Sequence, residues 1–375
     1  MGRILHTADF AAERAADLMS VLWKDVVEGR AGRPTRWTLG PLLTILAWPY
    51  DLAHRLRLQA YTRSWLSRQR LPCRVLSVGN LTLGGTGKTP LVEVIATWLQ
   101  ARGCRVGVLS RGYGRKGGGS IVVASDGAHV LRSPEEAGDE PVLLAEHLPG
   151  VPIIVGKDRF AAGMLAVERF GVDVLVLDDG FQHVSLARDL DILLLDAAHP
   201  LGNGRLFPRG DLREPPSALA RADAIVFTRW DPTIPTPALP HLPHPTPPLL
   251  HSQHEPVDLH GLHDGQTLPL ASLRNRRVLA FCGIGAPASF RCTLEELGAT
   301  VVAFRAFSDH HRYTRPELEA LTRLAASVRA EMVITTEKDR IRLRRFPALQ
   351  YPMWELRIRA RIVDQGPVWE RCLLG

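Results

Sequence analysis

Cysteine is scarce in this chain of 375 residues, and its spacing argues against disulfide and zinc frameworks. The five cysteines form no CxxC pair and have no histidine neighbour at metal-ligand spacing. We therefore expect reduced thiols in a protein that faces the cytosol. We expect no secretory signal, because Asp9, Glu13 and Asp17 interrupt the apolar positions near the start. No run reaches the ~20 apolar residues that a membrane-spanning helix needs.

The chain does contain enough apolar material for a large core. With 45% hydrophobic residues, its length suits two domains of ordinary size. The formal net charge of +7 favours anionic partners. Charge by itself does not choose between phosphates, acidic lipid headgroups and nucleic acid.

Short apolar runs recur along the chain, each closing on glycine or a polar residue, and most precede a helical stretch. Continuous apolarity is typical of strands covered on both faces, as in the parallel sheet of an α/β protein. The runs lie at 75–78, 106–109, 153–155, 174–177, 192–195, 225–227, 278–281, 301–304 and 333–334. The proline-rich segment 232–248 predicts a loop. Functional residues should gather at the carboxyl ends of the strands.

Segment 37–70 differs from the rest in composition. It has a short apolar block broken by Pro41 and Pro49, and then apolar residues at helical spacing among several arginines. The later apolar positions are Leu52, Leu56, Tyr61 and Trp65, and the arginines are Arg55, Arg57, Arg63, Arg68 and Arg70. A basic amphipathic helix of this kind suits the headgroup region of an anionic membrane. The pattern fits a helix packed on the domain itself equally well.

A glycine-rich loop follows the first predicted strand and precedes a predicted helix at 90–100. The residues of this loop are Gly84, Gly85, Thr86, Gly87, Lys88 and Thr89. Glycines let backbone N–H groups point at phosphates, and the helix N-terminus adds its dipole. Lys88 is expected to reach the β and γ oxygens of a nucleoside triphosphate, and the Thr89 hydroxyl to occupy a Mg²⁺ position.

The loop departs from the GxxxxGK[ST] pattern at one position, because the usual first glycine is Thr82. The GG-x-GKT form is that of the P-loop branch that contains partition ATPases. The signature lysine of that branch is replaced by Leu83, which disfavours a partition-type dimer switch. The alternative without nucleotide binding is a glycine-rich turn with an incidental Lys-Thr pair.

The predicted strand at 174–177 ends in two adjacent carboxylates, Asp178 and Asp179. In P-loop enzymes an acid at such a strand end holds Mg²⁺ opposite the loop hydroxyl. Two neighbouring carboxylates repel each other and lose solvation unless a cation lies between them. Both aspartates are therefore candidate metal ligands, with an ordinary acidic turn as the alternative.

Seven segments in a fixed order add up to a specific resemblance. They are VGNLTLGGTGKTP, SRGYGRK, GDEP, DDGFQH, PRGDLREP, FSDHHRY and TTEKD. The set resembles the tetraacyldisaccharide 4'-kinase family, the lipid A 4'-kinases of Gram-negative bacteria. The resemblance implies transfer of the ATP γ-phosphate to the 4'-hydroxyl of a tetraacylated glucosamine disaccharide 1-phosphate. It also implies a monotopic enzyme on the cytoplasmic face of the inner membrane, which favours the membrane interpretation of segment 37–70.

The resemblance further implies roles for individual residues. Asp139 matches the catalytic carboxylate that takes the proton of the sugar hydroxyl, and His310 matches the residue that orients it, although His311 is also possible. Glu214 matches a position that assists the Mg²⁺ site, and Arg213 is expected to steady the transferring phosphoryl group.

Two further matches carry less specific expectations. Arg111 either faces the substrate phosphate or is an ordinary surface arginine. The motif at 335–339 resembles a family signature, and its role stays open. Since Asp139 and His310 fall in different predicted domains, we expect domain closure to bring them together.

The fold class expected is α/β, with a P-loop NTPase-like, mostly parallel sheet flanked by helices, a second smaller α/β domain and an N-terminal membrane-associated helix. The predicted divisions are an extension of no assigned role at 1–36, the amphipathic segment at 37–70, the ATP-binding core at 71–195 and the second domain at 196–351. A tail at about 352–375 is expected to pack back on the core.

The expected cofactors are ATP and Mg²⁺, and the expected partners are the lipid A disaccharide precursor and the anionic lipid surface. We expect no nucleic acid and no obligate protein partner. Two alternatives remain open from the residues themselves. One is a P-loop switch ATPase or GTPase at the membrane, and the other is a membrane-docking regulator with a decayed nucleotide site.

Overall fold

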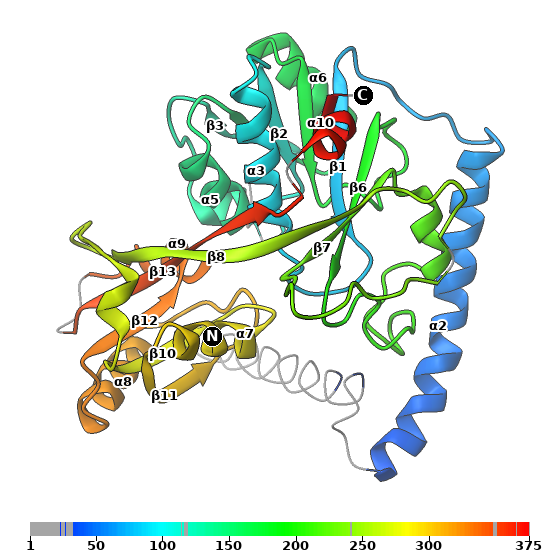
Figure 1. Cartoon of the computed structure of the whole chain (residues 1–375). Helices are drawn as coiled ribbons and strands as arrows, with labels where there is room; N and C mark the ends of the chain where they lie inside the picture. The colour runs from blue at the N-terminus through cyan, green and yellow to red at the C-terminus, as the bar shows by residue number, and fades with distance from the viewer. Residues whose placement is uncertain are drawn as a thin grey trace, which may run out of the picture.

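The computed structural model describes residues 23, 27, 33–113, 115, 119–240, 242–347, 351–364 and 366–374, with only the backbone of 33–38 (Figure 1). The extension expected at 1–36 therefore lies almost entirely outside the described residues. In the described part, 13 strands join into one mixed, mostly parallel sheet with helices packed against it, as the sequence predicted.

The core half of the molecule is built on seven strands in the order β7-β6-β1-β5-β2-β4-β3. They are β1 (Arg74–Asn80), β2 (Val106–Ser110), β3 (Ile121–Asp126), β4 (Pro152–Gly156), β5 (Val174–Asp178), β6 (Leu190–Asp196) and β7 (Ala224–Thr228). All pair in parallel except the edge strand β3, which runs antiparallel to β4. The helices are α3 (Lys88–Gln100), α4 (Pro134–Ala137), α5 (Asp139–His147), α6 (Arg159–Phe170) and the 3-10 turn η1 (Pro216–Arg221).

The second half is a smaller α/β unit whose strands follow the order β11-β10-β12-β13. Its elements are β9 (Thr267–Leu268), η2 (Leu270–Leu273), β10 (Arg277–Cys282), α7 (Pro287–Glu296), β11 (Thr300–Ala306), α8 (Arg315–Ser327), β12 (Met332–Thr336) and α9 (Glu337–Leu343). Every apolar run predicted as a strand lies within a strand of one half or the other. The proline-rich segment 232–248 is a loop between strands in its described residues, as predicted.

Two long antiparallel strands connect the halves, β8 (Leu249–Gly261) and β13 (Met353–Ile362) (Figure 1). The start of β8 pairs with β7 in the core half, and β13 pairs with β12 in the second half. The sheet thus continues without a break past residue 195, and the division expected there stays a prediction. After β13, the helix α10 (Pro367–Leu374) buries Trp369 and Leu373 in the hydrophobic cluster of the core half.

Helix α2 (Arg33–Thr62) stands at the edge of the molecule and continues through Pro41 and Pro49 (Figure 1). Residues turned toward the body recur three or four apart, which is helical spacing. This inner stripe is Gly40, Thr44, Ala47, Asp51, His54, Leu58 and Tyr61. Its other side exposes large apolar side chains, among them Leu42, Ile45, Leu46, Trp48, Leu52 and Leu56. None of the helices in the described ranges is long and apolar enough to cross a membrane.

Candidate active site

The glycine-rich loop lies where β1 ends and α3 begins. Gly84 and Gly87 adopt positive φ angles of 112° and 80°, which the absence of a Cβ makes accessible. Gly87 is the N-cap of α3, so the amide groups of the first turn face the loop. Thr82, which stands where a first glycine was expected, needs no positive φ and forms a β-bridge with Leu212. The departure from the usual pattern therefore does not distort the loop.

Lys88 connects this loop to the acidic strand end. Its Nζ donates to Asn80 Oδ1 at 3.2 Å and lies 3.6 Å from Asp179 Oδ1. The convergence follows from the sheet, because Val78 of β1 is in register with Asp178 of β5. Both strands are parallel, so their carboxyl ends meet at one edge. The loop and the two aspartates predicted to share a site are thus brought together.

The two aspartates have different partners. Arg213 donates to both carboxylate oxygens of Asp179 at 2.9 Å. Burial alone would raise the pKa of Asp179, but Lys88 and Arg213 outweigh it and hold that pKa below its ordinary value. Asp178 is buried deeper, and among the described residues only its Oδ2 has a partner, the hydroxyl of Ser110 at 3.2 Å. Burial, followed by the charges of Glu140 and Asp179, raises the pKa of Asp178 to about 7.

The donor set suits Mg²⁺ in the manner of nucleotide enzymes. Asp178 Oδ1 is buried and has no partner among the described residues, and burial with the charges of Glu140 and Asp179 raises the pKa of this carboxyl despite Lys88 and Arg159. Thr89 is buried at the start of α3. Within the described ranges, no group of three or more His, Cys, Asp and Glu side chains could hold a metal alone. Mg²⁺ binds through one or two protein ligands plus phosphates and waters, so this sparse set fits it.

Glu214, predicted to assist the metal, lies elsewhere. Its carboxylate is fully buried against His54 Nε2 of α2 at 3.1 Å and receives a hydrogen bond from Arg221 at 2.6 Å. It does not line the large pocket described below. Burial would raise its pKa, but His54 and Arg221 hold it below the ordinary value. In this structure Arg213 faces the aspartates and Glu214 faces α2.

Asp139, at the start of α5, meets residues of the second half. His310 Nδ1 lies 3.1 Å from Asp139 Oδ2, so the pair expected on closure is in contact. Arg342 of α9 donates to the same oxygen at 2.7 Å and also lies 3.0 Å from His310 Nδ1. Burial would raise the pKa of Asp139, but His310 and Arg342 together lower it. His311 points away and contacts Glu317 at 3.2 Å, which separates the two histidines that the sequence left open.

Arg342 and Lys338 are site residues that the sequence reasoning missed. Lys338 donates to Glu140 Oε1 at 2.5 Å, beside Asp139. The available signal was the 335–339 motif itself, which contains Lys338, together with the spacing of four that places Lys338 and Arg342 on one face of α9. Within that motif, buried Asp339 accepts hydrogen bonds from the Gly283 amide and the Tyr313 hydroxyl. The motif therefore orients α9, from which both cations reach the site.

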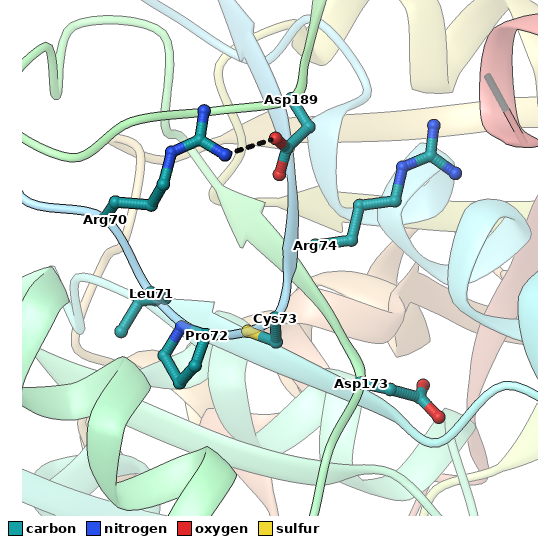
Figure 2. A pocket seen from close by; sticks show the side chains of 7 residues that line it. All are labelled: Arg70, Leu71, Pro72, Cys73, Arg74, Asp173 and Asp189. Carbon is teal, nitrogen blue, oxygen red and sulfur yellow. Dashed lines mark hydrogen bonds and ion pairs between the residues drawn. The ribbon is translucent and has the colours of Figure 1, made fainter.

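The glycine-rich loop, both aspartates after β5 and residues of the second half line a pocket of about 1370 Å³ between the two halves. The second half contributes His310 and Lys338, and Asp139 adjoins the pocket through its contact with His310. Arg57, Arg111 and Lys157 also line it and have no ionic partner in the part of the chain that the structure describes. A second hollow, of about 540 Å³, lies at the opposite end of β1 (Figure 2). There Arg70 pairs with Asp189 at 3.5 Å, and Arg74 donates to the Leu373 carbonyl. With its cations engaged and no glycine loop near, the second hollow is a poor phosphate site.

Comparison with known proteins identifies the family. A family model described as "Tetraacyldisaccharide-1-P 4'-kinase" matches residues 39–374. The tetraacyldisaccharide 4'-kinase of Syntrophus aciditrophicus is 44% identical over 355 residues, covering 92% of this chain and 94% of that protein. The corresponding kinase of Anaeromyxobacter dehalogenans strain 2CP-C is 48% identical over 310 residues, or 81% of each chain.

A solved structure agrees with these relatives. The ATP complex of LpxK from Aquifex aeolicus covers 90% of this chain and 100% of its own, with a TM-score of 0.72 and 33% identity. The match to a kinase family along most of the chain argues against the switch ATPase and the decayed regulator. This chain therefore belongs to the tetraacyldisaccharide-1-phosphate 4'-kinase family.

Proposed function

We propose that the pocket between the two halves is where this chain carries out its family's reaction, with Asp139 as the residue that receives the substrate proton. The reaction is transfer of the ATP γ-phosphate to the 4'-hydroxyl of a tetraacylated disaccharide 1-phosphate, a step of lipid A biosynthesis. The assignment of these residues is supported by one observation, which is that three groups lie together at one pocket. These are the loop with Lys88, the aspartates after β5 and the Asp139–His310 pair.

The phosphate side of the reaction is assigned to the core half. The loop amides and Lys88 would hold the β and γ phosphates, and Thr89 with Asp178 would hold Mg²⁺, which neutralises phosphate charge. Arg213 is placed by Asp179 at the edge of the pocket, from where its guanidinium can stabilise charge on the transferring group. These contacts are mostly electrostatic, as a loose phosphoryl transition state requires.

The acceptor side is assigned to Asp139. A carboxylate whose pKa is held low by His310 and Arg342 is a weak base. Its main contribution is then to orient the sugar hydroxyl, with proton removal late in the reaction. His310 Nδ1 can form only one of its two short contacts at a time. As a donor it holds Asp139, and as an acceptor it takes an N–H of Arg342.

Substrate recognition is assigned to the unpaired cations of the pocket. Arg57, Arg111 and Lys157 are exposed to the pocket and have no carboxylate partner among the described residues. A phosphate on the acceptor would supply the missing negative charge. The glycosyl 1-phosphate of the disaccharide is such a group, so these three residues are proposed to bind it.

The membrane surface is proposed as the source of the lipid substrate. Helix α2 carries its apolar side chains on the face turned away from the body, together with exposed arginines. That arrangement suits a helix lying among lipid headgroups. We place the protein at the cytoplasmic face of the inner membrane, bound through α2 without spanning the bilayer.

The Asp139–His310 assignment predicts strong coupling between the two residues. We expect Asp139→Ala and His310→Ala each to lower kcat for lipid phosphorylation by ~10²–10⁴, as loss of a positioned acid or base does. The double variant should lose little more than either single variant, because one unit is removed in each case. His311→Ala is the matched control and should keep wild-type kcat. Fully additive losses, or an equal loss in His311→Ala, would contradict the assignment.

A further inference from the structure

Helix α2 is attached to the catalytic edge by polar contacts in addition to packing. Tyr50 donates its hydroxyl proton to the carbonyl of Arg213 at 2.8 Å. His54, one turn later on the same face, lies 3.1 Å from the carboxylate of Glu214. Two neighbouring residues of one loop are thus held by two neighbouring turns of one helix. On the opposite face of α2, large apolar side chains such as Ile45 and Trp48 are exposed.

The anchored loop also positions a side chain in the pocket. Arg213 receives the Tyr50 contact on its backbone and uses its guanidinium to bind both oxygens of Asp179. Its amide donates to the Leu81 carbonyl at 2.7 Å, next to the glycine-rich loop. A shift of this loop relative to α2 would therefore move the Arg213 guanidinium relative to Asp179 and Lys88.

The contact between α2 and the Arg213–Glu214 loop depends on His54, because His54 is a partner of the buried Glu214 carboxylate. This carboxylate is fully buried, and its polar partners within the described residues are His54 and Arg221. Its second oxygen, Oε1, is buried and has no partner in the described part of the chain. Loss of His54 would leave the buried Glu214 carboxylate with Arg221 as its remaining partner. The Arg213–Glu214 loop would then shift to expose this carboxylate to water.

We infer that His54 is a positioning residue for phosphoryl transfer. It fixes the Arg213–Glu214 loop against α2, and through it the Arg213 guanidinium on Asp179. As a result, the helix proposed to lie on the membrane sets the geometry of the catalytic edge. The inference rests on the proposed roles of Arg213 and Asp179.

The test compares His54→Ala with the conservative variant His54→Gln, whose amide N–H can still donate to Glu214. Lipid phosphorylation is measured with detergent-dispersed substrate, giving kcat and the KM for ATP. His54→Ala is expected to lower kcat about tenfold or more, which corresponds to ~1.4 kcal/mol of transition-state stabilisation, with the KM for ATP within about twofold. His54→Gln should recover most of kcat. Gln59→Ala, an exposed position on the same helix, is the matched control and should behave as wild type.

Three further measurements separate the possible causes. Thermal melting should show that His54→Ala and His54→Gln both remain folded at the assay temperature, and the two variants should bind anionic vesicles equally. Equal losses of kcat in both variants, or a loss that follows vesicle binding, would overturn the inference. Arg213→Ala reports on the proposed function separately. If it loses kcat while His54→Ala does not, only the present inference fails, and if Arg213→Ala keeps kcat, the proposed role of Arg213 fails as well.

Discussion

Single residues set the charge balance of the pocket between the two halves. The aspartates after β5 show how much of this charge balance could be predicted from the sequence. Their position at a strand end predicted acids near the phosphate loop, which the structure places there. Their opposite pKa shifts could not be predicted, because Arg213 lies 34 residues from Asp179 along the chain. The same limit explains Glu214, whose partner His54 lies 160 residues away.

A partly buried charge, His147, gives a prediction about stability and pH. Its ring lies 2.9 Å from Glu93 and 3.2 Å from Glu337. Burial alone would lower the pKa of His147, but the hydrogen bonds and charges of Glu337 and Glu93 outweigh it and raise the pKa to about 10 from an ordinary 6.5. The protonated ring therefore stabilises the fold fully below pH 6.5, and this contribution is lost as the pH rises toward 10.

We expect His147→Gln to lower the free energy of unfolding by ~1–3 kcal/mol near neutral pH, because a charged hydrogen bond between partly buried groups is lost. The variant should also show a shallower fall in stability between pH 6.5 and 10 than the wild type. Chemical denaturation across this pH range measures both. His129→Gln is the control, since that ring is 77% exposed beside Asp126. Parallel curves for wild type and His147→Gln would contradict the assignment of charge.

At the scale of helices and strands, local pattern predicted the strands that carry a continuous apolar run, most of which are buried, although the edge strand β11 is only partly so. The strands that it missed are β3, β8, β9 and β13. Strand β13 carries Arg357, Arg359 and Arg361 on its partly exposed side, so it shows no continuous apolar run. Strand β8 contains Pro256 and charged residues, so it also shows no continuous apolar run. Antiparallel linking strands with one exposed face do not carry the signal of a buried parallel sheet.

Helix α2 gives the prediction for membrane binding. Ile45 and Trp48 are 68% and 78% exposed on the outer face. Burial of a large apolar side chain is worth ~1.5–3 kcal/mol, so Ile45→Ser with Trp48→Ser should weaken binding to anionic vesicles by at least tenfold. Flotation of each variant with anionic vesicles measures this binding. Ile234→Ser, which removes a 58% exposed side chain from the proline-rich loop, is the control. Equal flotation of both variants would contradict membrane docking through α2.

At the scale of the whole molecule, a row of charged contacts between α5 and α9 joins the two halves beside the pocket. Asp139, Glu140 and Glu146 of α5 meet Arg342, Lys338 and Arg340 of α9. The sequence alone predicted two α/β units and, through the family resemblance, one pair that joins them. The remaining contacts lie about two hundred residues apart in the chain. Local residue spacing carries no information about contacts between residues so far apart in the chain. These contacts could therefore be identified only from the folded structure.

The measurement that tests the account most directly is transfer of label from γ-labelled ATP to a tetraacylated disaccharide 1-phosphate, by the wild type and by Lys88→Ala. The account predicts labelled lipid carrying the new phosphate at the 4'-position with the wild type. A loss of at least ~10² in rate is expected for Lys88→Ala, because this variant removes the cation that lies 3.6 Å from Asp179 and that we propose binds the phosphates. Label found only as free phosphate, or equal rates for the two proteins, would contradict it.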